Sequence, residues 1–296
     1  MQMTGPILWS VLTTMTAAGL LVGIVVHALP PRRIAGPHRD DGDRPLAPLL
    51  AVFALAVLAW LIVPGFYVAS RQPPSPDATR PASRPAYELG NREMVLLTTA
   101  AGACGLAVLA VGHLLMAGRW LAPLGLRMRQ VPAAVVQGLV GSLIVLPMMW
   151  WLSLLTPLLW HTLGRDHPGE HRMLQLLGDT GDPLMRWLII LSAAILAPVF
   201  EEWLFRGHLQ TLIASALRRH SPLGHMVETR LRWTAIALAS LAFASVHEWW
   251  MQPPIFVLSL ALGYAYERTG NLWTAIFIHA AFNSSSLAVF IWLVSR

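Results

Sequence analysis

The sequence predicts an all-α fold, a polytopic bundle of about eight transmembrane helices. Of its 296 residues, 55% are hydrophobic and 12% are charged, whereas soluble domains carry about 25% charged residues. The mean hydropathy is +0.56. Apolar runs of about twenty residues, the length that a helix needs to cross a bilayer, recur along the chain. Composition, hydropathy and run length therefore all favour a multi-pass membrane protein.

Eight apolar segments are candidates for these spans, of which the fifth is long and the seventh short. The first follows the segment MQMTGP, which has no basic side chain. Its apolar run also exceeds a typical signal-peptide core, so we expect a retained span there. The eight candidates lie at about 7–29, 48–69, 94–117, 133–160, 186–217, 232–248, 254–267 and 272–294.

Between the spans, two stretches rich in Pro and charge, PPRRIAGPHRDDGDRPLAP and SRQPPSPDATRPASRPAYELG, predict loops without a packed element. The segment 165–186 differs, because it places MLQLL between polar flanks. Such an alternation of apolar and polar residues predicts a short amphipathic helix on the membrane surface.

The net charge of +6 comes from arginines in the short loops, and the chain has no lysine. A positive excess in such loops sets membrane orientation, so the charge indicates topology rather than nucleic-acid binding. Twelve arginines follow the odd-numbered spans and eight lie on the opposite side, which predicts that both termini are outside. Together with the Gly and Pro content, the absence of lysine suggests a GC-rich genome. We expect a bacterial plasma (inner) membrane location.

Ionisable side chains at membrane depth are costly and are therefore candidates for function. In the C-terminal half they occur in VFEEWLFRG, LAFASVHEWW and IFIHAAFNSS. In the first segment Glu202 and Arg206 are four residues apart, which predicts an ion pair on one helix face. Glu201 projects about 100° away and lacks that partner. The spacing therefore predicts a structural Glu202–Arg206 pair and a Glu201 that is free to act as a general base.

The other two segments supply polar groups from neighbouring helices. His279 and Asn283 share one helical face, and both can donate hydrogen bonds toward a common point. His247 lies near the end of a helix, on the same face as Phe243. These residues predict a hydrolytic site in which Glu201 and His247 activate a water molecule. His279 and Asn283 would stabilise the oxyanion.

These segments resemble the motifs of a known family. EEWLFR fits an EExxxR motif, FASVH an FxxxH motif and HAAFN an HxxxN motif, with RTGNLW leading into the last. In this order they are similar to the CPBP family of intramembrane glutamic endopeptidases, also called the Abi or CAAX-protease family. The resemblance covers about residues 133–294. The stretch 1–130 resembles nothing further.

The resemblance implies an all-helical membrane protease without a metal or other cofactor. It assigns water activation to Glu201 and His247 and the oxyanion hole to His279 and Asn283, with Glu202 and Arg206 as structural support. Its partners would be membrane lipids and a membrane-associated protein or peptide substrate, with no nucleic acid. Eukaryotic relatives act on prenylated CAAX tails, but nothing in this sequence indicates a prenylated substrate.

Two domains follow from the position of the motifs. We expect an N-terminal transmembrane region at 1–130, with about three spans and Pro- and Arg-rich loops, and a CPBP-type protease core at 131–296. All three motifs lie after residue 198, so we expect the first 130 residues to be dispensable for the geometry of the site.

Two alternatives remain open. Two Glu and two His can also bind zinc, as in a metalloprotease, although HEWWM lacks the second His of an HExxH motif because Met251 occupies that position. The protein could instead be a non-catalytic immunity or scaffold protein of the membrane. The single cysteine, Cys104, excludes an internal disulfide and a CxxC metal site.

Overall fold

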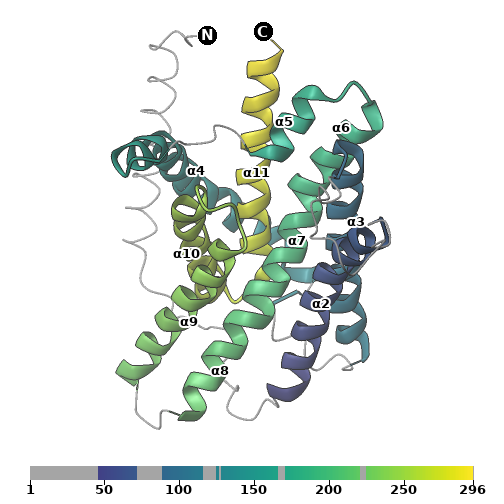
Figure 1. Cartoon of the computed structure of the whole chain (residues 1–296). Helices are drawn as coiled ribbons and strands as arrows, with labels where there is room; N and C mark the ends of the chain where they lie inside the picture. The colour runs from purple at the N-terminus through teal and green to yellow at the C-terminus, as the bar shows by residue number, and fades with distance from the viewer. Residues whose placement is uncertain are drawn as a thin grey trace.

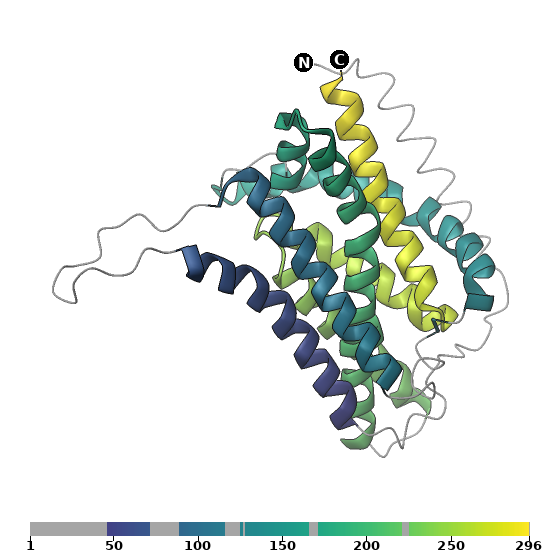
Figure 2. The same ribbon diagram turned by 90° about the vertical axis from the view of Figure 1, so that its right-hand side faces the viewer.

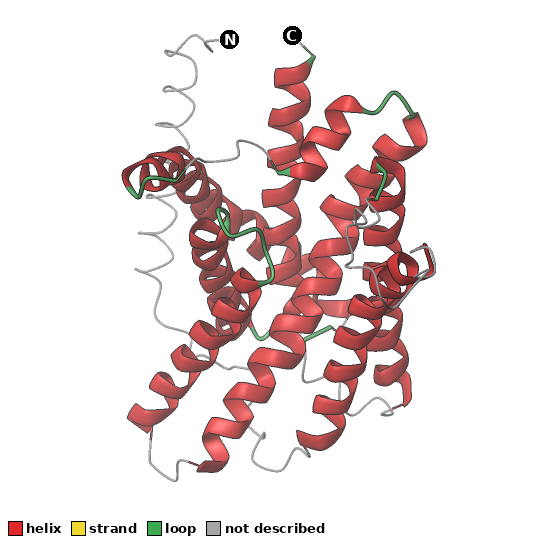
Figure 3. Cartoon of the chain, in the orientation of Figure 1, coloured by secondary structure: helices red, strands yellow, loops and turns green. Residues whose placement is uncertain are grey.

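The computed structural model describes residues 46–71, 89–115, 125–126, 128–165, 171–220 and 225–295. Within these ranges all regular structure is helical (Figure 3), which confirms the predicted all-α class. The α-helices are α2 (Leu46–Arg71), α3 (Asn91–Leu115), α4 (Val131–Thr162), α5 (Arg172–Asp179), α6 (Pro183–Leu191), α7 (Ala197–Glu202), α8 (Thr211–His220), α9 (His225–Ser245), α10 (Gln252–Thr269) and α11 (Leu272–Val294).

Five stretches of these helices are long and apolar enough to cross a membrane. They match the second, third, fourth, fifth and eighth predicted spans, so the chain is a multi-pass membrane protein. The predicted span 254–267 falls within α10, and 232–248 overlaps α9 but runs past its end at Ser245; neither helix meets the same criteria. The predicted span 7–29 lies outside the described residues. The five stretches are Leu46–Arg71, Asn91–Leu115, Met128–Thr162, Pro183–Arg219 and Leu272–Val294.

The fourth of these stretches is a single long helix at the centre of the bundle (Figure 1). It consists of α6, a π-helical segment η4 (Ser192–Leu196), α7, a second π-helical segment η5 (Trp203–Gln210) and α8. We call this the glutamate helix, because Glu201 and Glu202 lie in α7. The sequence predicted a regular helix here, so both π segments are a difference that the structure reveals.

The glutamate helix lies between two groups of helices. α2 and α3 pack side by side on one flank, and α4, α9, α10 and α11 cover the other (Figures 1 and 2). On the α3 side Phe200 is seated against Gly105, where a Cβ atom would lie 2.5 Å from the Phe200 ring. The main hydrophobic core spans both groups, since it includes Leu109 of α3, Phe200 and Leu258 of α10.

The amphipathic helix predicted within 165–186 is present as α5. His171 precedes it as the N-cap, and its Nδ1 accepts a hydrogen bond from the Met173 amide at 3.2 Å. The apolar face of α5 buries Leu176 and Leu177 against a second small core that contains Phe290 of α11. The helix therefore ties the segment before the glutamate helix to the end of α11.

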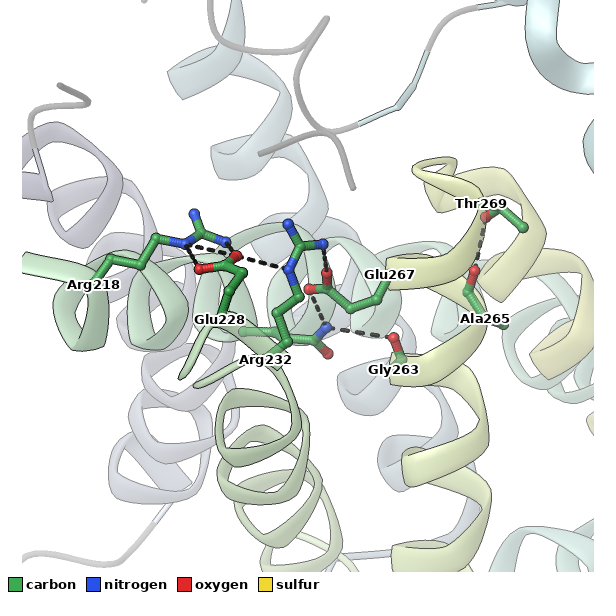
Figure 4. Close-up of polar contacts among 8 residues, drawn as sticks. Arg218, Glu228, Arg232, Gly263, Ala265, Glu267 and Thr269 are labelled. Atoms are coloured by element: carbon green, nitrogen blue, oxygen red, sulfur yellow. Dashed lines mark hydrogen bonds and ion pairs between the residues drawn. The ribbon is translucent and has the colours of Figure 1, made fainter. Parts of the chain in front are cut away.

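A network of ion pairs joins α8, α9 and α10 at one end of the bundle (Figure 4). Arg218 and Arg232 both contact Glu228, at 2.9 and 2.8 Å. Arg232 also pairs with Glu267 at 3.1 Å, and Glu267 accepts a hydrogen bond from Gln210 at 3.0 Å. Two Arg and two Glu balance in charge, and Gln210 links the network to the second π segment of the glutamate helix.

The network predicts an acid-sensitive contribution to stability. Burial raises the pKa of Glu228, but hydrogen bonds from Arg232 and Arg218 outweigh burial, so its pKa lies below the ordinary value of 4.5. A carboxyl with a depressed pKa in the folded state stabilises the protein above the unfolded-state pKa and loses this effect as the pH falls. Between about pH 6.5 and about pH 3.5, the unfolding temperature of the wild type should therefore fall more than that of Glu228→Gln. Equal falls in both proteins would contradict this role.

Candidate active site

The predicted ion pair within the glutamate helix is present and fully buried. Glu202 and Arg206 side chains are 0% and 1% exposed, and Arg206 Nη1 lies 3.0 Å from Glu202 Oε1. Arg206 Nη2 donates to the Ser259 hydroxyl at 2.8 Å and to the Ser259 carbonyl at 3.2 Å. Its guanidinium also lies 4.6 Å from the centre of the Phe243 ring. The pair is therefore held by α9 and α10 as well as by its own helix.

His279 of α11 lies between the two glutamates. Its Nδ1 is 2.8 Å from Glu202 Oε1, and its Nε2 is 3.8 Å from Glu201 Oε2. A carboxylate only accepts hydrogen bonds, so Nδ1 donates to Glu202, and Nε2 is the ring nitrogen that faces Glu201.

The two glutamates differ in access. The side chain of Glu201 is 21% exposed, whereas that of Glu202 is fully buried. Glu202 Oε1 accepts from both Arg206 and His279, while its Oε2 has no hydrogen-bond partner within the described part of the chain. Glu201 is therefore the carboxylate that a water molecule or a substrate can reach, and Glu202 is occupied by its protein partners.

His247 lies just beyond the end of α9, next to the Phe243 ring. Its Nδ1 is 2.7 Å from the Phe243 carbonyl, so Nδ1 donates and Nε2 can accept a proton in the neutral ring. The Phe243 ring centre lies 4.7 Å from that of His247 and 6.0 Å from that of His279. The Phe243 ring is thus a neighbour of both histidines, and no described hydrogen bond joins His247 to Glu201.

Asn283 lies one turn beyond His279 and contacts the first π segment. Its Nδ2 donates to the carbonyl of Ala193 at 2.8 Å. In this segment the amide of Ala197 bonds to the Ser192 carbonyl, five residues back. The next such bond would come from Pro198, which has no amide hydrogen. Asn283 therefore supplies the donor that Pro198 lacks, and one further Nδ2 hydrogen remains for another partner.

A comparison with protein-family models finds a match in the C-terminal half of the chain. Residues 183–285 fit the model described as type II CAAX prenyl endopeptidase Rce1-like. We call this segment the Rce1-like domain. It starts with the glutamate helix and includes every predicted site residue up to Asn283, which confirms the predicted family. No curated protein and no solved structure matches the chain.

The Rce1-like domain does not include all the helices around the site. α2, α3 and α4 precede it in the sequence, although α2 and α3 pack directly against the glutamate helix. Trp60 of α2 meets the Phe200 ring edge-on at a centroid distance of 5.8 Å. These contacts argue against the expectation that the first 130 residues are dispensable for the geometry of the site.

One residue near the site was not predicted from the sequence. His171, the N-cap of α5, lies close enough to the segment after α9 for Glu248 and His247 to influence its pKa. Burial lowers the pKa of His171 below its ordinary value, and the charge of Glu248 opposes this shift. The sequence around His171 contains no motif, so it gave no signal that His171 lies near these residues.

No group of three or more His, Cys, Asp or Glu side chains within the described ranges is placed to hold a metal ion. Four ionisable residues of the Rce1-like domain form a row, from Arg206 through Glu202 and His279 to Glu201. Such a row can transfer a proton and stabilise a developing charge. Hydrolysis by an activated water molecule requires both.

Proposed function

We propose that the protein is an intramembrane endopeptidase of the glutamic type, in which Glu201 activates a water molecule. The Rce1-like family implies a protease that acts on membrane-associated proteins. The observation that supports the glutamic mechanism is the position of His279 between a buried, paired glutamate and a partly exposed one. This arrangement divides the tasks: Glu202 fixes His279, and Glu201 remains free for the water.

In the proposed reaction Glu201 accepts a proton from water while the water oxygen attacks the carbonyl carbon of the scissile peptide bond. The tetrahedral intermediate then expels the amine, which receives the proton from Glu201. His247 is proposed to assist, because its Nε2 can accept or return a proton when Nδ1 donates to the Phe243 carbonyl. Side-chain rotation or a bridging water would have to connect His247 with Glu201.

The oxyanion of the intermediate requires hydrogen-bond donors. When its ring is protonated, His279 can donate from Nε2 while Nδ1 stays bonded to Glu202, and Asn283 retains one Nδ2 hydrogen beyond the one given to Ala193. Both side chains come from the same face of α11. We assign them as the oxyanion donors.

These roles predict different defects at Asn283 and His247. Asn283→Ala should lower kcat about 10²–10³-fold, the scale for losing one oxyanion donor, with an unchanged shape of the pH–rate profile. His247→Ala should lower the rate and also alter the limb of the profile that reports the Glu201–His247 couple. Steady-state kinetics across pH distinguishes the two, and an unaltered profile in His247→Ala would contradict its role in proton transfer.

The substrate class is tested with two internally quenched peptides of identical sequence. One ends in a farnesylated Cys-aliphatic-aliphatic-X tail, the substrate type named in the family description, and the other lacks the lipid. Purified protein in nanodiscs should cleave at least one of them, with the cut located by mass spectrometry. Cleavage of the farnesylated peptide alone would assign a lipidated substrate. Cleavage of neither, with unlabelled membrane proteins also intact, would favour a non-catalytic role.

The metalloprotease alternative predicts a different response. A zinc enzyme loses activity with a strong chelator and regains it with added zinc. The glutamic mechanism expects activity to persist after chelation, and expects no rescue of Asn283→Ala or His247→Ala by zinc. Metal analysis of the purified protein completes this comparison.

A further inference from the structure

α3 runs along the glutamate helix and meets it at three successive levels. The Thr99 hydroxyl lies 2.9 Å from the Ser192 hydroxyl. One turn on, a Cβ atom at Gly102 would lie 3.6 Å from Leu196. At the third level, a Cβ atom at Gly105 would lie 2.5 Å from Phe200. The contacts advance in steps of three residues on α3 and of four on the glutamate helix, so each row follows one helical face.

The first level fixes the start of the π segment. Thr99 Oγ1 donates to the Val95 carbonyl at 2.8 Å, so its single hydrogen is used and the Ser192 hydroxyl donates to Thr99. Ser192 is the first residue of the π segment, and its carbonyl accepts the wide-turn hydrogen bond from Ala197. Thr99 on one side and Asn283 on the other therefore hold the segment that precedes the glutamates.

The third level fixes the residue next to Glu201. Phe200 is 3% exposed, and its ring fills the notch that the missing side chain of Gly105 leaves. Trp60 of α2 packs edge-on against the same Phe200 ring. Phe200 directly precedes Glu201. The depth of the Phe200 ring in this notch therefore determines where the backbone of Glu201 lies.

We propose that Thr99 and Gly105 are positioning residues for the active site, although α3 lies outside the Rce1-like domain. Thr99 holds the π segment in register, and Gly105 lets the glutamate helix approach α3 until Glu201 stands opposite His279. This inference rests on the proposed role of Glu201. It also gives the N-terminal region a defined part in catalysis.

The test uses matched substitutions in the full-length protein in nanodiscs, with the quenched peptide that the wild type cleaves. Gly105→Ala should lower kcat about 10–100-fold, since a displacement of about 1 Å costs up to 100-fold in rate, with a smaller change in KM. Gly102→Ala, one turn earlier on the same face with an ordinary contact to Leu196, should stay within about twofold of the wild type.

Two further comparisons separate positioning from a general loss of folding. Adding Phe200→Leu to Gly105→Ala removes the ring atoms that the new methyl group meets. The double variant should therefore be faster than the product of the two single-variant rate losses predicts. Thr99→Val should lower kcat. Thr99→Ser, which keeps the hydroxyl, should leave kcat close to that of the wild type. Thermal unfolding of each variant shows how much protein is folded.

The outcomes distinguish this inference from the proposed function. If Glu201→Gln is inactive while Gly105→Ala and Thr99→Val match the wild type per folded molecule, the positioning role of α3 is overturned and the function stands. If Glu201→Gln retains full turnover, the proposed function itself fails. Equal rate losses in Gly102→Ala and Gly105→Ala, or a lack of recovery in the Phe200→Leu double variant, would also overturn the notch as the positioning element.

Discussion

Glu201→Gln is expected to lower turnover by about 10²–10⁴-fold, the contribution of a positioned general base, without reducing the unfolding temperature. The substitution keeps the size of the side chain and removes only the group that accepts the proton. Glu201 is partly exposed, and its closest described ionic partner is His279 at 3.8 Å, so the folded state loses little. Peptide cleavage and thermal unfolding, measured on the same preparation, test both parts.

Glu248→Gln serves as the matched control. This residue follows His247 directly and is exposed, with a hydrogen bond to Trp250 at 2.7 Å. The substitution removes the same charge close to the site, but turnover should stay near that of the wild type. A comparable loss in both variants would mean that the local charge, rather than a base at Glu201, governs the rate.

The second large effect is expected at the neighbouring glutamate. Glu202→Gln should destabilise the protein by about 3–5 kcal/mol, because it removes one member of a fully buried ion pair. The amide oxygen that replaces the carboxylate can still accept a hydrogen bond, but Arg206 would lose its buried counter-charge and His279 would lose the carboxylate that holds Nδ1. Chemical or thermal unfolding in detergent measures this loss.

The comparison of the two variants decides which glutamate has which role. A stable but inactive Glu201→Gln and a destabilised Glu202→Gln would support the division of tasks. Equal loss of stability in both would contradict it, and the reversed pattern would show that Glu202 is the base. Arg206→Gln offers an independent check, since it should resemble Glu202→Gln in stability.

Much of the site could be predicted from spacing alone. The four-residue interval between Glu202 and Arg206 fixes their pairing on any helix, and the structure confirms it. The order of the three motifs identified the family, which the match to residues 183–285 confirms. The ion pair depends on the geometry of one helix, and each motif is a short local pattern, so both can be recognised without knowledge of the tertiary structure.

The tertiary contacts of the site could not be predicted in this way. The π segments have no distinctive composition, and only Pro198 signals that a backbone hydrogen bond near Ala193 must be replaced. Its replacement by Asn283 comes from a residue 90 positions away. The seating of Phe200 against Gly105 likewise depends on how α3 packs, for which a glycine in an apolar run gives little warning.

The placement of both charges of the buried ion pair on one helix affects how the protein can be made. Each charged residue at the centre of an isolated span opposes entry into lipid by about 3 kcal/mol on insertion scales. Glu202 and Arg206 lie one turn apart, so they can neutralise each other as soon as that turn forms, before any other helix arrives. Glu267 and Arg232, by contrast, come from different helices and meet only on assembly. During biosynthesis the most deeply buried charges of the site can therefore enter the membrane as a neutral unit, and His279 and Ser259 join them when the bundle closes.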